Sequence, residues 1–134
     1  WVSAYQITPQ HESIYYFDYA QMATPRAEEL NKSINTSTGS ITSGGKTLAT
    51  LSGNSIQSSG GIQSRSATSL SDVTIPPTDG YSTAALTVQQ NQLYLTKTVD
   101  GGKNYYGKIF VKSFSGTTAT VDYCIQLAAD VLSY

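Results

Sequence analysis

Apolar and polar residues alternate most regularly in the last third of the chain. From Thr118 to Leu127 every second residue is apolar, and the residues between them are polar except for Cys124. A period of two places the apolar residues on one face of an extended chain. The pattern therefore predicts a half-buried β-strand over this segment.

Two further strands are predicted just before this one. Leu93–Thr98 is rich in residues that favour strands, and Tyr105–Phe114 follows after a short interval. Asp100-Gly101-Gly102 lies between them and predicts a tight hairpin turn, because glycine adopts positive φ angles without steric cost. Gly116 marks the next turn. The three strands are expected to form an antiparallel meander.

The first third of the chain predicts more strands and one short helix. Ser13–Tyr19 is expected to be a strand with aromatic residues on both faces, and Val2–Ile7 a shorter one. Thr24 and Pro25 are residue types that favour the start of a helix, and the glutamates that follow complement the helix dipole. A short helix is therefore predicted from Thr24 to Leu30.

The middle segment, Ser33–Ser71, is dominated by small polar residues and glycine, yet isolated apolar residues recur in it. These are Ile34, Ile41, Leu48, Leu51, Ile56, Ile62 and Leu70. A flexible linker would lack them, so short strands are expected here. The expected turns are at Gly39, Gly44-Gly45, Gly53 and Gly60-Gly61, and a loop is expected at Pro76-Pro77 and Asp79-Gly80. A disordered Ser/Gly-rich insertion is the alternative.

These patterns predict an all-β fold, an antiparallel sheet, sandwich or meander with at most one short helix, in a single domain over residues 1–134. Only 13% of the residues are charged, whereas 18 serines and 17 threonines supply polar surface. This composition is common in extracellular β-proteins, so a secreted or cell-surface domain is expected. The sequence has no basic block for nucleic-acid binding and no apolar run of the roughly 18–20 residues that cross a membrane.

Side chains suited to catalysis or metal binding are sparse. His11 is the one histidine and Cys124 the one cysteine, and they are expected in a loop and in a strand. A nucleophile–base pair could come only from these two residues. No zinc or calcium signature is present, and nothing in the sequence pairs the carboxylates. The sequence therefore predicts a non-enzymatic protein with no catalytic residues and no metal site.

Three other features allow more than one interpretation. The place of Cys124 in a strand predicts a buried or half-buried thiol, with a reactive thiol or an intermolecular bridge as alternatives. Asn31-Lys32-Ser33 and Asn35-Thr36-Ser37 match the N-glycosylation pattern, which matters only in an organism that glycosylates. The ten tyrosines either pack in the core and sheets or offer a stacking platform for a sugar or planar cofactor.

The segment Leu93–Ile109 resembles the C-terminal hairpin of the HmuY-like lipoproteins of Bacteroidetes. It has a strand ending in Lys97-Thr98, an Asp-Gly turn, and a second strand with a Tyr-x-Lys pattern. The stretch Tyr15–Tyr19 is similar to an early aromatic strand of that family, and Ser69–Pro77 to the loop before its final sheet. The Trp-Asp block that usually marks the first half of the family is missing here.

This resemblance implies an all-β surface lipoprotein that captures haem or another ligand. Haem capture in the family uses two axial side chains, typically His or Met, which here would be His11 and Met22. Tyr15, Tyr105 and Tyr106 are further candidates for contact with a ligand, because tyrosine also ligates haem iron. The predicted strand between His11 and Met22 would separate them by about 20 Å, which disfavours one shared iron.

Two functions of different classes follow. The first is a non-enzymatic cell-surface or secreted ligand-binding module, HmuY-like, with a small molecule or a protein as its partner. The alternative is a structural subunit of an extracellular filament or adhesive surface layer, assembled through its sheet edges by strand addition.

Overall fold

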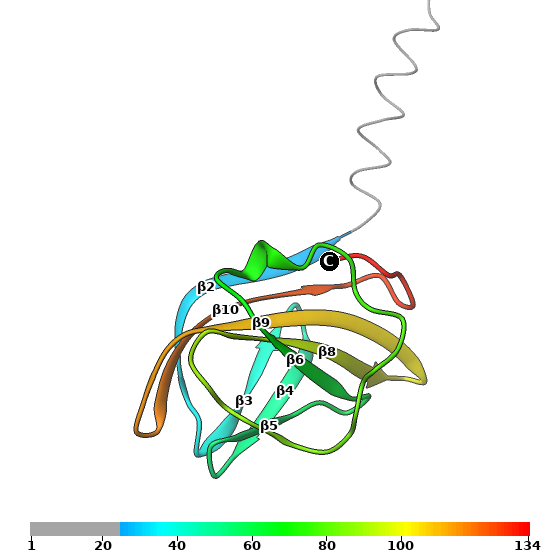
Figure 1. Cartoon of the computed structure of the whole chain (residues 1–134). Helices are drawn as coiled ribbons and strands as arrows, with labels where there is room; N and C mark the ends of the chain where they lie inside the picture. Colours follow the sequence, from blue (N-terminus) through cyan, green and yellow to red (C-terminus); the bar gives the residue numbers. More distant parts are fainter. Residues whose placement is uncertain (1–24) are drawn as a thin grey trace, which may run out of the picture.

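The computed structural model describes residues 25–134, so the expected strands Val2–Ile7 and Ser13–Tyr19 lie outside the described residues. Within the described part, nine strands form two antiparallel sheets, and one 3-10 turn, η1 (Leu70–Asp72), is the remaining regular element. Figure 1 shows the two sheets stacked as layers. The predicted all-β class is confirmed. The described residues contain no helix long and apolar enough to cross a membrane.

The larger sheet has the strand order β2-β10-β9-β8-β6. Its middle is the predicted meander of β8 (Gln92–Asp100), β9 (Lys103–Ser115) and β10 (Thr118–Gln126). The β8–β9 turn consists of Gly101 and Gly102, whose φ angles are 61° and 77°. Two successive positive φ angles are what a type I′ hairpin requires, so the predicted turn is confirmed.

The two edge strands of this sheet are β2 (Arg26–Asn35) and β6 (Ile62–Ser66). The helix predicted at Thr24–Leu30 is wrong for its described residues, because Arg26–Glu29 pairs antiparallel with β10. An isolated helix of so few residues is marginal in water. Pairing with β10 instead gives the backbone groups of an extended strand hydrogen-bond partners, so tertiary context overrides the local helix signals.

The smaller sheet has the order β3-β4-β5-β7. Its strands are β3 (Thr38–Ser43), β4 (Lys46–Ser52), β5 (Ser55–Gln57) and β7 (Leu86–Thr87). The expected turns at Gly44-Gly45, Gly53 and Gly60-Gly61 are confirmed, as is the loop at Pro76-Pro77 and Asp79-Gly80. The alternative of a disordered Ser/Gly-rich insertion is wrong. The turn predicted at Gly39 is wrong, because Gly39 lies inside β3, with a φ of 141°.

The main hydrophobic core lies between the two sheets. The middle segment contributes Ile41, Leu48, Leu51, Ile56 and Ile62, and the meander contributes Tyr94, Ile109, Val111, Val121 and Ile125. Burying a large apolar side chain stabilises a fold by about 1.5–3 kcal/mol. The isolated apolar residues of the polar middle segment are therefore what attaches the smaller sheet to the meander.

The outer face of the larger sheet is covered as well. A second cluster consists of Leu70, Val73, Leu93, Leu95, Tyr106, Phe110, Cys124 and Tyr134. Its cover comes from the segment around η1 and from the C-terminal residues, which Figure 1 shows on the side of the sheet away from β3–β5. Cys124 is buried, as expected. Gln126 is also fully buried, so the half-buried strand prediction is wrong for this end of β10.

The core position of Val121 can be tested by placing a charge there. Val121 and Ile125 are both 0% exposed, whereas Thr118 on the same strand is exposed. Val121→Asp and Ile125→Asp are each expected to lower the free energy of unfolding by at least about 3 kcal/mol, because they bury an unpaired carboxylate. Urea denaturation measures this, with Thr118→Asp as the control. Parent-like midpoints for both core variants would contradict the assigned facing of β10.

Candidate functional site

A hollow opens at one side of the sandwich because β5 is shorter than its partner strand. β5 pairs with only Thr50–Ser52 of β4, so the first half of β4, Lys46–Ala49, has no strand beside it there. The last residues of β8 line the other side. Between β4 and β8 remains a hollow of about 570 Å³. A difference in strand length, rather than any single residue, therefore creates the site.

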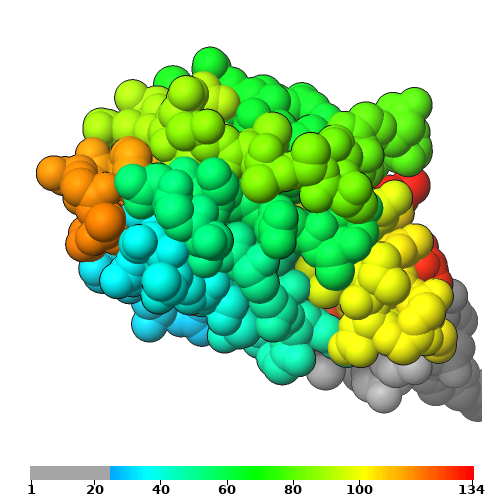
Figure 2. Space-filling model, turned by 90° about the horizontal axis from the view of Figure 1, so that it is seen from below, coloured from blue at the N-terminus to red at the C-terminus, as the bar shows by residue number. Residues whose placement is uncertain are grey.

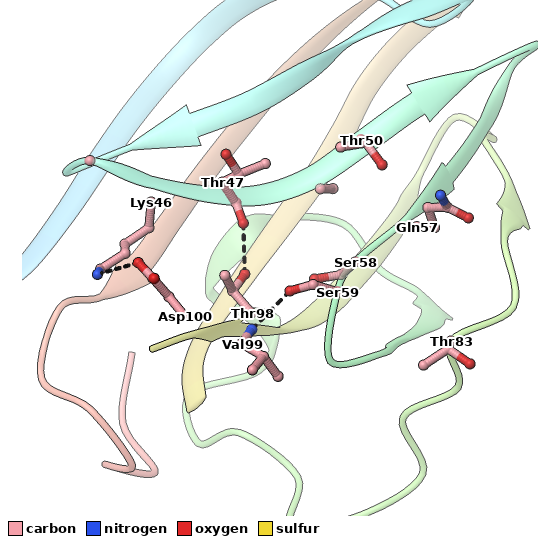
Figure 3. Close-up of a pocket in the computed structure, with 12 residues that line it drawn as sticks. Lys46, Thr47, Thr50, Gln57, Ser58, Ser59, Thr83, Thr98, Val99 and Asp100 are labelled. Carbon is pink, nitrogen blue, oxygen red and sulfur yellow. Dashed lines mark hydrogen bonds and ion pairs between the residues drawn. The ribbon is translucent and has the colours of Figure 1, made fainter. Parts of the chain in front are cut away.

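Most of the residues that line this hollow have polar, uncharged side chains. Its residues are Gly45, Lys46, Thr47, Ala49, Thr50, Gln57, Ser58, Ser59, Thr83, Thr98, Val99 and Asp100. Seven of these twelve carry a hydroxyl or amide side chain. Figure 3 shows them converging from β4, β5, β8 and the loop that contains Thr83. In Figure 2 the β4–β5 segment borders the β8–β9 turn, drawn in yellow, on the same side of the molecule.

Hydrogen bonds hold β8 to the residues opposite it. Thr98 Oγ1 donates to the carbonyl oxygen of Thr47 at 2.8 Å and links the two sheets directly. Ser59 Oγ accepts from the amide of Val99 at 2.8 Å, and Ser58 Oγ donates to the β8 backbone at 3.1 Å. These contacts, drawn in part in Figure 3, fix the walls of the hollow before any ligand arrives.

The charged residues at the rim neutralise each other. Lys46 Nζ lies 2.7 Å from Asp100 Oδ2 and 4.3 Å from the centre of the Tyr105 ring. The hydrogen bond that Lys46 donates to Asp100 raises the pKa of Lys46 above its ordinary value, so its ammonium stays charged at neutral pH. The hollow therefore presents a neutralised ion pair at its rim and no net charge.

Other side chains of the hollow are free to contact a ligand. Thr50, Gln57 and Thr83 are exposed, and their polar atoms make no hydrogen bond to another residue of the described chain. Thr50 and Gln57 lie opposite each other on β4 and β5. Both also line a neighbouring hollow of about 320 Å³, together with Ser52, Ser55 and Ala85. The two hollows thus share a pair of free hydrogen-bonding side chains.

The chemistry available here is hydrogen bonding. Hydroxyl and amide groups both donate and accept, so they match ligands that present several hydroxyls. The one carboxylate of the hollow, Asp100, is already paired with Lys46. Between residues 25 and 134, no group of three or more His, Cys, Asp and Glu side chains is placed to hold a metal ion.

Tyr105 and Tyr106, the two predicted ligand-contact residues that the structure describes, do not line this hollow. His11, Met22 and Tyr15 lie outside the described residues. Tyr105 packs against the inner core, whereas Tyr106 belongs to the outer cluster, where its ring centre is 6.0 Å from that of Tyr81. Successive residues of a strand point to opposite faces. Tyr105 and Tyr106 therefore cannot contact the same small ligand.

The hollow itself was missed by sequence reasoning. Its one signal was the Gly60-Gly61 pair, interpreted only as a turn. A Cβ at Gly60 would lie 2.6 Å from the carbonyl oxygen of Lys97, and the Gly60 amide donates to that oxygen at 2.7 Å. Glycine thus lets the chain after β5 turn towards β8 and leave the first half of β4 uncovered.

The asparagines of the two N-glycosylation patterns and the single cysteine were also predicted from the sequence to have possible roles. Asn31 has a φ of 56°, and its side-chain oxygen accepts from Lys112 Nζ at 2.6 Å. Asn35 Oδ1 accepts from the amide of Ser37 at 2.8 Å. Burial raises the pKa of the Cys124 thiol, which favours its neutral, unreactive form.

Comparison with protein-family models, with curated proteins and with solved structures found no match for this chain. The site is therefore interpreted from its own geometry.

The link between the sheets at the hollow can be tested with two threonines on β8. Thr98→Val is expected to lower the free energy of unfolding by about 1 kcal/mol, because it removes the bond to the Thr47 carbonyl at nearly constant volume. Thr96 Oγ1 is also buried but has no partner among the described residues. Thr96→Val is therefore expected to leave stability unchanged or raise it. Urea denaturation of both variants checks this, and equal losses would contradict the assigned bond.

Proposed function

We propose that this domain is a non-enzymatic ligand-binding module, secreted or at the cell surface, and that it holds a neutral polyhydroxylated ligand such as an oligosaccharide. The observation that carries the proposal is the hollow between β4 and β8, in which seven of twelve lining residues carry an uncharged hydroxyl or amide group. The side chains of Thr50, Gln57 and Thr83 are exposed and make no hydrogen bond to another described residue. A low content of charged residues and many serines and threonines support the extracellular setting.

The size and shape of the site support a ligand longer than one sugar ring. A volume of about 570 Å³ falls within the range of about 300–1,000 Å³ usual for ligand pockets. The neighbouring hollow extends the polar surface past Thr50 and Gln57. A linear ligand could therefore contact both hollows while these two side chains hydrogen-bond to its middle.

Haem capture has less support than sugar binding. Of its five candidate residues, His11, Met22 and Tyr15 lie outside the described part of the chain, and Tyr105 and Tyr106 face opposite sides of β9. Haem binding stays a prediction that rests on the family resemblance.

The filament alternative depends on sheet edges that could accept a strand from another molecule. β2 carries charged residues, Arg26, Glu28, Glu29 and Lys32, and charge on an edge opposes such pairing. β7 is only two residues long. β3 is an uncharged edge of six residues, but it lies against β2 where the chain crosses between the sheets. These edges support a filament less than the hollow supports a binding module.

The two functions predict different sizes in solution. A binding module is expected to elute as a monomer of 14.3 kDa at every concentration tested. Size-exclusion chromatography with light scattering, run from micromolar to millimolar protein, measures this. Polymers that grow with concentration would favour the filament subunit instead.

Sugar binding is tested by screening neutral oligosaccharides of two to four units by saturation-transfer NMR, followed by calorimetry on the best binder. Gln57→Ala and Thr50→Val are each expected to weaken binding about three- to tenfold, because each removes a hydrogen-bonding group. Gln89→Ala is the matched control, since Gln89 is exposed and lies outside both hollows. The proposal fails if no sugar of the panel binds, or if the control weakens binding as much as Gln57→Ala.

A further inference from the structure

A separate hollow of about 420 Å³ lies on the outer face of the larger sheet. Its lining includes Arg26, Leu30, Leu70, Thr74, Lys108 and Tyr134. These residues come from β2, from β9, from the segment around η1 and from the C-terminal end. Figure 1 shows η1 and the C-terminus together on this side of the sheet. The hollow shares no residue with the one between β4 and β8.

Lys108 is the unusual member of this lining. It is only 5% exposed, and its cross-strand partners, Cys124 on β10 and Leu95 on β8, are both 0% exposed. Tyr106 and Phe110, two residues away along β9 in each direction, are buried in the same cluster. The lysine therefore stands on an apolar patch of the sheet, where a charge is costly unless it is paired.

The pairing of Lys108 is incomplete. Its Nζ donates to the carbonyl oxygen of Val73 at 2.7 Å and lies 4.7 Å from the centre of the Tyr134 ring. No carboxylate of the described residues lies within ion-pair distance of it. Burial accordingly lowers the pKa of the ammonium. An ammonium has three donors, and only one of them has a partner here.

The acidic residues of the hollow are engaged elsewhere. Glu28 forms an ion pair with Arg26 at 2.9 Å. Cys124 on β10 pairs with Glu28 on one side and with Lys108 on the other, so it separates the two charged residues. Asp122 lies 3.5 Å from Lys112 Nζ and accepts from the backbone amide of Asn31 at 2.8 Å. Neither carboxylate neutralises Lys108.

The ring of Tyr134 lies beside Lys108, with its centre 4.7 Å from Nζ. Tyr134 as a whole is 9% exposed, so its ring is held in place by packing. Its hydroxyl is closed off from solvent, so a ligand in the hollow meets the ring and not the hydroxyl. The hollow thus combines an ammonium that no carboxylate of the described residues neutralises with the apolar side chains of Leu30 and Leu70.

We propose that this hollow is a second binding site, which takes a small monocarboxylate with a short apolar group. The carboxylate accepts a hydrogen bond from Lys108 Nζ, while Leu30 and Leu70 contact the apolar part. A monoanion fits better than a phosphate, because Glu28 and Asp122 line the same hollow and repel further negative charge. This site does not depend on the proposed sugar binding.

The test is a titration of the ¹⁵N-labelled full chain with sodium butyrate at constant ionic strength, followed by amide chemical shifts. Saturable shifts at Thr74, Lys108 and Tyr134 are expected, and butyramide, which is uncharged, is expected to cause none. Lys108→Met should weaken butyrate binding at least about tenfold, because it removes a charged hydrogen bond.

Lys97→Met is the matched control. Lys97 lies on the neighbouring strand β8 with its Nζ 5.1 Å from the Tyr81 ring centre, and it does not line the hollow. This variant should bind butyrate like the parent. A thermal melt verifies that Lys108→Met is folded, as expected for replacement of a buried charge by an apolar chain of similar length. Absence of saturable shifts, unchanged binding in Lys108→Met, or tighter binding of inorganic phosphate would each overturn the proposal.

Discussion

The meander of β8, β9 and β10 is buried on both faces, and this constraint governs how the described chain is arranged. Its inner face packs against β3, β4 and β5, and its outer face packs against the segment around η1 and the C-terminal residues. Gly107 in β9 shows how closely both covers approach the meander. A Cβ there would lie 2.9 Å from Thr96 Oγ1, 3.0 Å from the Cys124 carbonyl oxygen and 3.1 Å from Leu48 Cδ2.

Neither the smaller sheet on the inner face nor the segment around η1 on the outer face covers the meander completely, and each leaves a hollow. On the inner side, β5 is only three residues long, so the first half of β4 faces the end of β8 across an open space. On the outer side, an irregular segment and a chain end replace a regular layer. Irregular segments follow a sheet less closely than strands do, which leaves space around Lys108.

The two hollows differ in the interactions that they can make. The inner-edge hollow is lined by hydroxyl and amide groups, and its single ion pair is closed within the protein. A ligand there gains hydrogen bonds, and electrostatic attraction contributes little to its binding. The outer hollow holds a buried ammonium against an apolar patch, so electrostatic attraction would dominate binding there. Two ligands of different chemistry could thus be bound without competing for the same residues.

The sequence alone determined the meander, its glycine turn and the burial of the isolated apolar residues of the middle segment. These features depend on local alternation and on the conformational freedom of Gly101 and Gly102, which a single segment of chain already specifies. The tertiary structure decided the rest. Arg26–Leu30 is a strand because β10 pairs with Arg26–Glu29, and Gln126 is fully buried although the alternation places it on the polar face of its strand. Both hollows depend on how far one segment extends beside another, and no local pattern encodes that distance.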